Sequence, residues 1–241
     1  MAAKLNASVS LLAMGLALAS GSALAYQQGD MIVRAGAALV EPQEDSDELT
    51  VNGTKLTTAV GGAVAPAEAG VDSNTQLGLT FVYMVSDNIG LEVLAATPFS
   101  HNITANLGAV GTVDAAEVKH LPPTVSVQYF PMGAGSELQP YVGVGLNYTT
   151  FFDEEVDDEL DAVTTSLGLG DARSLEVDDS FGLALQLGCD YAINENLVVN
   201  AAVWMIDIDT TATFKYAGGN KIEGDVDIDP MAYMVGLGYK F

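Results

Sequence analysis

Residues 76–85 read Gln-Leu-Gly-Leu-Thr-Phe-Val-Tyr-Met-Val, and their side chains separate into two alternating sets. One set is Leu77, Leu79, Phe81, Tyr83 and Val85, and the other is Gln76, Gly78, Thr80, Val82 and Met84. Such alternation predicts a β-strand that has one face in apolar surroundings. A strand in a soluble sandwich usually has about five or six residues, whereas a tilted strand that crosses a bilayer needs about 9–11. The length of this segment therefore favours a membrane-spanning strand.

The same alternation recurs along the chain, and residues 181–191 show it as clearly. It predicts strands at residues 29–40, 75–85, 89–98, 122–130, 139–151, 180–192, 197–209 and 228–241. Short connections alternate with long ones, and the long ones are residues 41–74, 99–121, 152–179 and 210–227. Short turns on one side and long loops on the other are typical of outer-membrane barrels. Because every backbone polar group must be paired inside lipid, the predicted fold is all-β, an eight-stranded antiparallel transmembrane β-barrel.

The first 25 residues have the features of an export signal. Lys4 precedes an apolar stretch from Leu11 to Leu18, and small residues follow at Ala23 and Ala25. An N-terminal membrane anchor is the alternative, but the apolar stretch has about half of the roughly 20 residues that a spanning helix needs. We therefore expect a signal peptide at residues 1–25 and a barrel at residues 26–241, placed in the outer membrane of a bacterial cell.

The charged residues test this assignment. Asp207, Asp209 and Asp229 fall on the outward face, but at the exterior ends of neighbouring strands, where a charge costs little compared with the lipid midplane. We expect them to mark the outer edge of the membrane. The other charged residues of the predicted strands fall on the inward face, and they are Asp30, Arg34, Glu92, Asp190 and Lys240.

The composition is strongly acidic. Without Lys4, the predicted mature part has 7 basic and 32 acidic residues, a formal net charge of −25. Nucleic acid is excluded as a partner, because phosphate contacts need a basic surface. Residues 153–179 alone hold eleven acids against Arg173, which solubility or a saline habitat explains as well as a specific role does. This loop lacks the spacing and the central glycine of a calcium-binding EF-hand.

Apolar side chains also dominate the inward positions of the predicted barrel. These candidate lumen-lining residues are Val82, Met84, Leu94, Trp204, Ile206 and Met234. A water-filled porin has a polar interior, so this pattern favours a passage for apolar molecules. The alternative is a plain core, because eight strands leave an interior that side chains can fill.

The remaining candidates carry weaker signals. His101 and His120 flank a long loop with Glu117 nearby, but loop histidines without ligand spacing are usually solvated, so we expect no metal site. Pro98, Pro122 and Pro123 lie at strand ends, where a proline either ends the strand or leaves a weak seam in the wall. Cys189, the only cysteine, can form no internal disulfide and is expected to face lipid as a small apolar residue. No cofactor is expected.

The chain ends with apolar residues at every second position from Tyr233 to Tyr239, followed by Lys240 and Phe241. Such an ending resembles the signal that the outer-membrane assembly machinery reads. A strand that ends in phenylalanine by chance is the alternative, which the export signal and the other predicted strands make less favourable.

Several short segments together resemble the OmpW family. They are Thr75–Phe81, Asp87–Gly90, Leu94–Phe99, Leu121–Thr124, Asn147–Asp153 and Val203–Thr210. The resemblance covers essentially the whole predicted mature chain. It implies an eight-stranded barrel with an apolar lumen that admits small hydrophobic molecules, and it implies a constriction at Leu94 and Trp204. The long loops differ most from the family pattern.

Two functions from different classes follow. The first is a passive channel for small hydrophobic solutes, which enter from outside and leave sideways into the membrane; its partners are those solutes and the surrounding outer-membrane lipid and lipopolysaccharide. The second is a structural or interaction barrel whose acidic extracellular loops bind a partner. An enzyme is not expected, since no acid, base and nucleophile converge at the barrel rim.

Overall fold

The structure is a computed structural model that describes residues 26–62, 68–107, 111–132 and 136–241. The predicted signal peptide at residues 1–25 lies outside the described residues. In the part of the chain described, no helix is long and apolar enough to cross a membrane.

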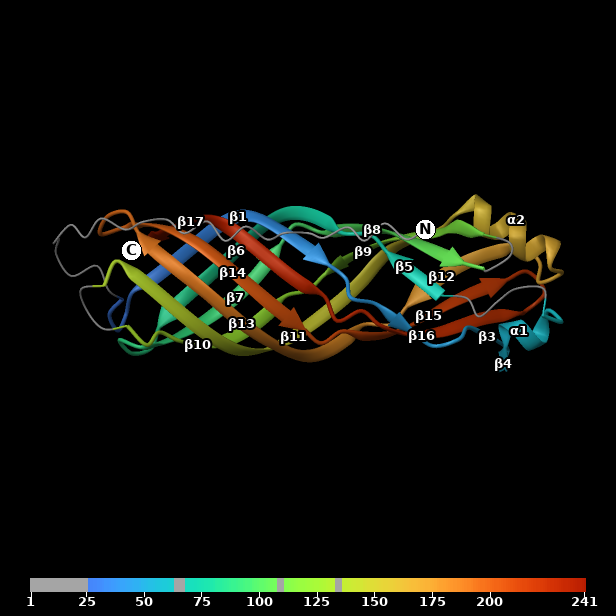
Figure 1. The fold of residues 1–241 in the computed structure, drawn as a ribbon, viewed down its shortest axis with the longest axis horizontal. Helices are drawn as coiled ribbons and strands as arrows, with labels where there is room; N and C mark the ends of the chain where they lie inside the picture. The colour runs from blue at the N-terminus through green and yellow to red at the C-terminus, as the bar shows by residue number, and fades with distance from the viewer. Residues whose placement is uncertain (1–25, 63–67, 108–110, 133–135) are drawn as a thin grey trace, which may run out of the picture.

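Eight antiparallel strands form a closed barrel (Figure 1). Their bounds are β1 (Met31–Glu41), β6 (Asn74–Met84), β7 (Ile89–Ala96), β10 (Thr124–Tyr129), β11 (Leu138–Val156), β13 (Ser180–Ala192), β14 (Leu197–Ile206) and β17 (Met231–Lys240). The strands follow the order β10-β7-β6-β1-β17-β14-β13-β11, and β10 also pairs with β11, which closes the ring. Each strand overlaps one of the predicted segments, so the predicted fold class is confirmed.

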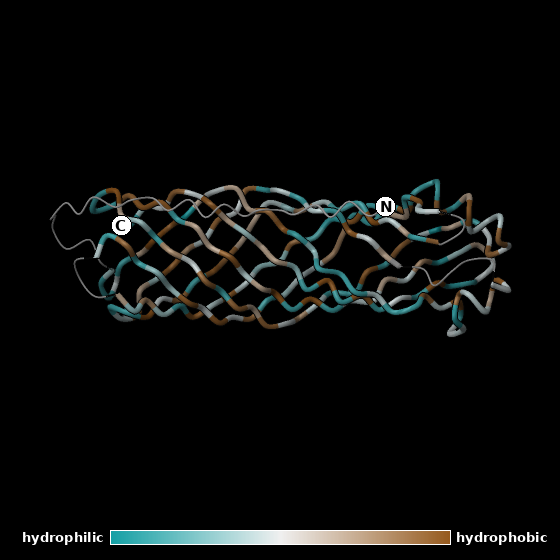
Figure 2. Tube along the Cα trace, viewed as in Figure 1, coloured by the Kyte–Doolittle hydropathy of each residue, from teal (hydrophilic) through white to brown (hydrophobic). Residues whose placement is uncertain are grey.

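The outward face of the barrel is apolar, as the alternation predicts. Leu77, Leu79 and Phe81 on β6 are exposed, and so are Leu183 and Leu185 on β13 and Val235 and Leu237 on β17. In Figure 2 brown hydrophobic segments recur along the crossing strands of the barrel. Burying this face in lipid tails removes it from water, which is the arrangement a membrane barrel requires.

The long connections fold into further strands beyond the lipid-facing band, at the end of the molecule opposite the C-terminus (Figure 1). Three of them, β5 (Glu68–Val71), β8 (Phe99–Asn106) and β9 (Thr112–Leu121), continue the sheet from the outer part of β11. A second sheet contains β3 (Thr50–Val51), β4 (Thr54–Lys55), β12 (Ala172–Val177), β15 (Asp209–Tyr216) and β16 (Lys221–Asp227), with β2 (Asp45–Ser46) paired to β16. The helices α1 (Leu56–Ala59) and α2 (Asp158–Ser166) complete this extracellular extension.

The boundary between barrel and extension shows where the membrane ends. Among the described residues, large exposed hydrophobic side chains reach outward only as far as Val93, Tyr148, Phe181, Met205 and Tyr233 on their strands, and the extension has none. Just beyond lie the exposed side chains predicted to mark the outer edge, Asp207, Asp209 and Asp229. Their carboxylate oxygens come within 4.8 Å of one another.

Candidate functional site

A buried polar cluster fills the periplasmic half of the barrel. The Arg34 guanidinium on β1 donates to Asp190 on β13 through Nε at 3.0 Å and through Nη2 at 2.5 Å. Its Nη1 donates to Glu92 on β7 at 3.2 Å, and all three residues are fully buried. The inward phase predicted for these three residues is therefore correct, and one cation contacts two carboxylates inside the barrel.

Neutral side chains complete this polar cluster. Tyr26 donates its hydroxyl to Asp190 at 2.5 Å, and Asn200 donates to the other oxygen of the same carboxylate at 2.8 Å. The Arg34 guanidinium also lies 5.1 Å from the centre of the Tyr141 ring. A buried ion pair is stable only when good geometry and further hydrogen bonds offset the loss of hydration. Asp190 receives both, whereas Glu92 Oε1 has no hydrogen-bond partner among the described residues.

An apolar cavity lies on the extracellular side of the polar cluster, and we call it the inner cavity. It measures about 30 Å³. Four of the six predicted lumen-lining residues form its wall, namely Leu94, Trp204, Ile206 and Met234. The other two, Val82 and Met84, are buried nearer the periplasmic turn of β6 and do not reach this cavity. The structure thus brings together only part of the predicted lumen set.

The three candidate prolines interrupt the sheet beside the inner cavity. The β7–β10 ladder ends at the pair Leu94 and Thr124, and the β8–β9 ladder begins at Phe99 and His120. Proline has no N–H to donate, which accounts for the break. Pro122 lines the inner cavity together with Ala95 and Ala96.

The Asn147 side chain on β11 holds the far edge of this break. Asn147 Nδ2 donates to the carbonyl oxygens of Pro122 at 3.2 Å and Pro123 at 3.3 Å. Pro98 and Pro123 are themselves exposed. We call the interval between the two ladders, residues 95–98 and 121–123, the seam.

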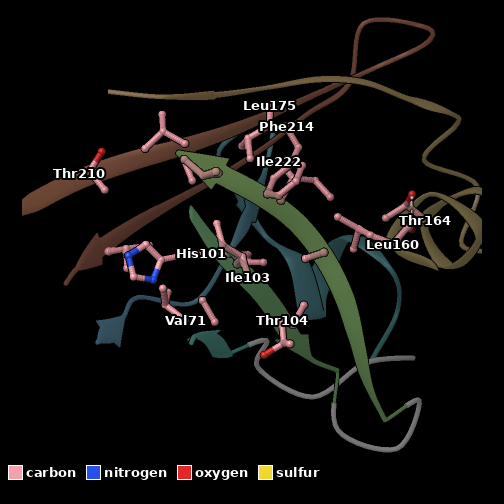
Figure 3. Close-up of a pocket in the computed structure, with 18 of the residues that line it drawn as sticks. Val71, His101, Ile103, Thr104, Leu160, Thr164, Leu175, Thr210, Phe214 and Ile222 are labelled. Atoms are coloured by element: carbon pink, nitrogen blue, oxygen red, sulfur yellow. Dashed lines mark hydrogen bonds between the residues drawn. The ribbon is translucent and has the colours of Figure 1, made fainter. Parts of the chain in front are cut away.

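A larger apolar cavity, the outer cavity, lies in the extracellular extension (Figure 3). It measures about 110 Å³ and is enclosed by β8, β9, α2 and the second sheet. Ile103, Leu160, Leu175, Phe214 and Ile222 point into it from these different elements. A dry apolar cavity of about 150 Å³ binds benzene in another protein, so the outer cavity is of the size class that holds a small apolar molecule.

The outer cavity is not predicted from the sequence, because the pattern of the long connections indicates only loops. A signal was present, since Phe214 and Tyr216, and likewise Ile222 and Val226, alternate with polar neighbours. These runs are shorter than the barrel strands, and acidic residues interrupt them.

The expectation of solvated loop histidines is wrong. His101 and His120 are buried, 4% and 5% exposed, because β8 and β9 turn both rings into the extension. Their ring centres are 4.9 Å apart, and His120 also contacts Phe99 and Phe151. Glu117 is exposed and accepts from Ser100 instead of approaching the imidazoles.

Burial sets the charge of both histidines. Desolvation lowers the pKa of His101, against a smaller opposing effect of Asp72. Desolvation and the neighbouring His101 lower the pKa of His120 to about 3. Both imidazoles are therefore neutral near pH 7. His120 lines both cavities and so forms the boundary between them.

Comparison with known proteins agrees with this architecture. The sequence model of the OmpW family matches residues 27–241. Outer membrane protein W of Vibrio cholerae is 48% identical over 231 residues, which cover 95% of this chain and 97% of that protein.

Solved structures show the same likeness. The crystal structure of the outer membrane protein OprG from Pseudomonas aeruginosa has 43% sequence identity and a TM-score of 0.80, covering 91% of this chain and 99% of that one. The solid-state NMR structure of the outer membrane protein AlkL in lipid bilayers has 25% identity and a TM-score of 0.59, covering 95% and 97%. The chain therefore belongs to the OmpW family and is a β-barrel protein of the bacterial outer membrane.

Proposed function

We propose that the protein is a passive channel for small hydrophobic molecules, which enter from outside and leave sideways into the outer membrane. The carrying observation is the arrangement of the two cavities. Both are apolar, they meet at His120, and the inner one is bounded by the seam at Ala95, Ala96 and Pro122. A solute that follows this series reaches lipid without leaving apolar surroundings.

The buried polar cluster supports a lateral exit over an exit into the periplasm. An apolar solute that continued along the barrel axis would have to separate Arg34 from Glu92 and Asp190. Removing one partner from a buried ion pair costs about 3–5 kcal/mol, which an alkane cannot offset with hydrogen bonds of its own. The seam lies beside Leu77 and Tyr148 on the neighbouring strands, whose side chains are exposed. In this proposal its outer side therefore faces lipid, where an apolar solute is stable.

Leu94 and Trp204 act as the constriction in this proposal. Both line the inner cavity, whose volume of about 30 Å³ is far below that of a small hydrocarbon. Passage therefore needs side-chain movement, and the seam, which lacks ladder bonds, is the part of the wall where neighbouring backbone gives way most readily.

Replacement of Trp204 by Ala tests the proposed constriction. The measurement is octane uptake by whole cells that have an intact lipopolysaccharide leaflet and an internal alkane-oxidising enzyme. We expect a changed uptake rate in a barrel that still assembles, judged by heat-modified gel mobility, because lumen changes tune selectivity. Cells without the protein provide the baseline.

A core residue would behave differently. Loss of a large buried aromatic from a plain core costs about 3–5 kcal/mol of stability without a specific transport effect. Normal uptake through a less stable Trp204→Ala barrel would therefore contradict the constriction. If cells without the protein take up octane as fast as cells with it, the channel fails and the interaction barrel with acidic loops takes its place.

A further inference from the structure

The outer cavity has three polar atoms that an apolar wall does not explain. The Nε2 atoms of His101 and His120 and the hydroxyl of Tyr216 are buried, and none has a hydrogen-bond partner among the described residues. Thr164 and Thr210 of the same wall are satisfied, since they donate their hydroxyls to the carbonyls of Leu160 and Asp178. A buried polar atom without a partner costs about 1–3 kcal/mol, so an unpaired histidine pair calls for a ligand.

The hydrogen bond on the other side of the His101 ring fixes what its Nε2 can do. His101 Nδ1 lies 2.5 Å from the backbone carbonyl oxygen of Asp72. A carbonyl oxygen only accepts, so Nδ1 must carry the proton and donate it. The pKa of His101 is lowered by burial, and in the neutral ring the other nitrogen is then unprotonated. His101 Nε2 is therefore an acceptor that needs a donor.

His120 is free to complement this acceptor. No described side chain or backbone group fixes its tautomer through a hydrogen bond, so its Nε2 can carry the ring proton and donate. The two ring centres are 4.9 Å apart. One oxygen atom that makes two hydrogen bonds of about 2.8 Å joins nitrogens up to about 5.6 Å apart. A ligand shared by the two rings therefore needs their Nε2 atoms within this distance and turned toward the cavity.

We propose that the histidine pair makes the outer cavity a binding site for uncharged apolar molecules that carry a hydroxyl group, meaning alcohols and phenols. The hydroxyl donates to His101 Nε2 and accepts from His120 Nε2, while the hydrocarbon part lies against Ile103 and Phe214. This inference rests on the proposed function, because it names the solutes that the entrance of the channel prefers.

The same geometry disfavours other classes of ligand. An alkane satisfies neither nitrogen, and an ether or ketone offers no proton to His101. A carboxylate or an ammonium group would bring a net charge into an apolar wall, which is costly unless it is paired. The favoured ligand is therefore an uncharged apolar molecule of modest size, with one group that both donates and accepts a hydrogen bond.

The test compares octanol with its isomer heptyl methyl ether and with octane. The full-length mature barrel is placed in lipid nanodiscs with histidine labelled by nitrogen-15, and each compound is added to the same mole fraction in the membrane. We expect octanol to shift the His101 Nε2 resonance and to bind about tenfold tighter than the ether, as one net hydrogen bond predicts. Protein-free nanodiscs correct for partition into lipid.

Two variants with matched chemistry sharpen the test. His101→Phe keeps an aromatic ring but removes the acceptor, and should abolish the preference for octanol over the ether. Tyr216→Phe removes the third unpartnered polar atom of the cavity and so tests whether this hydroxyl holds the ligand in place of the histidine pair; the preference should remain unchanged. Because the wild-type comparison stands alone, a variant that fails to fold does not remove the test.

The outcomes separate this inference from the function on which it rests. Equal affinity of the wild-type protein for octanol and its ether overturns the alcohol site while leaving an apolar channel intact. Absence of binding by all three compounds overturns both. Retention of the preference in His101→Phe, or its loss in Tyr216→Phe, also overturns the assignment to the histidine pair.

Discussion

The two halves of the interior differ in the charge that they bury. In the periplasmic half, Arg34, Glu92 and Asp190 pair with one another and with Tyr26 and Asn200. In the extracellular half, the walls are apolar, and the Nε2 atoms of His101 and His120 and the Trp204 Nε1 lack partners among the described residues. Both halves contain buried polar atoms without partners among the described residues, since Glu92 Oε1, Gln128 Oε1 and Gln186 Nε2 lack them in the periplasmic half. The difference is that the periplasmic half buries ion pairs, whereas the extracellular half places neutral polar groups beside apolar cavities.

This difference bears on the path that a solute takes through the protein. The lining of the inner cavity contains the seam residues Ala95, Ala96 and Pro122, and it contains none of the three charged residues of the polar cluster. Substitutions in the two halves and on the surface test this contrast, and the largest expected change comes first.

Replacement of Arg34 by Met should destabilise the barrel by about 3–5 kcal/mol, because Glu92 and Asp190 would keep their negative charges without a buried cation. The measurement is the urea midpoint of barrels folded in lipid. The triple variant Arg34→Met, Glu92→Gln and Asp190→Asn should recover much of the loss, since it removes the unpaired charges. An unchanged midpoint for the single variant would show that the polar cluster does not hold the periplasmic half closed.

Acidification should lower the stability of the extracellular extension, and protonation of His120 should cause part of that loss. Burial lowers the pKa of His120 to about 3, below the value of about 6.5 expected in an unfolded chain. The unfolded form then binds more protons, so the stability from this group is complete above pH 6.5 and falls as the pH drops toward 3. The titratable neighbours are His101, beside His120, and Asp72, beside His101.

The variant His120→Phe isolates this contribution, because a phenyl ring can occupy the place between Phe99 and Phe151 and cannot titrate. Hydrogen exchange of the β8 and β9 amides should accelerate on going from pH 7 to pH 4 less in the variant than in the wild type, after correction for intrinsic exchange. At pH 4 the difference should correspond to about 2–3 kcal/mol. Equal acid sensitivity of the two proteins would show that burial of this imidazole carries no such cost.

The smallest effect should come from the surface of the extension. Lys215 pairs with Glu176 between β15 and β12, but both side chains are largely exposed. Exposed ion pairs contribute about 0–1 kcal/mol, so Lys215→Ala should change the urea midpoint little. A fall in the urea midpoint as large as that for Arg34→Met would show that buried and exposed ion pairs contribute equally to stability, which would contradict the expected difference between them.

The barrel was predictable because lipid imposes a strict rule on sequence. The alternation around Leu79 and Leu185 and the confinement of Arg34, Glu92 and Asp190 to the inward phase follow from one apolar and one enclosed face. The seam prolines were likewise visible, since a missing N–H is a property of the residue itself.

The extension was not predictable in the same way, because no lipid acts on it. His101 and His120 looked like solvated loop residues, and only the pairing of β8 with β9 buries them. Val82 and Met84 have the same inward phase as Leu94, yet they lie nearer the periplasmic end of the barrel and do not line the inner cavity. The alternation of a strand predicts whether a side chain points inward or outward. Which cavity an inward side chain lines depends on the residues packed around it in the folded barrel.

Closing the seam with a reversible cross-link tests the central claim of lateral exit most directly. In a Cys189→Ala background, Ala96→Cys and Pro122→Cys place thiols on the two sides of the seam, and Ala201→Cys with Val235→Cys provides a control pair within the β14–β17 ladder. We predict that oxidation of the seam pair stops octane uptake by whole cells, that reduction restores it, and that oxidation of the control pair has no effect. Full uptake through a barrel whose seam is shown to be cross-linked would contradict the account.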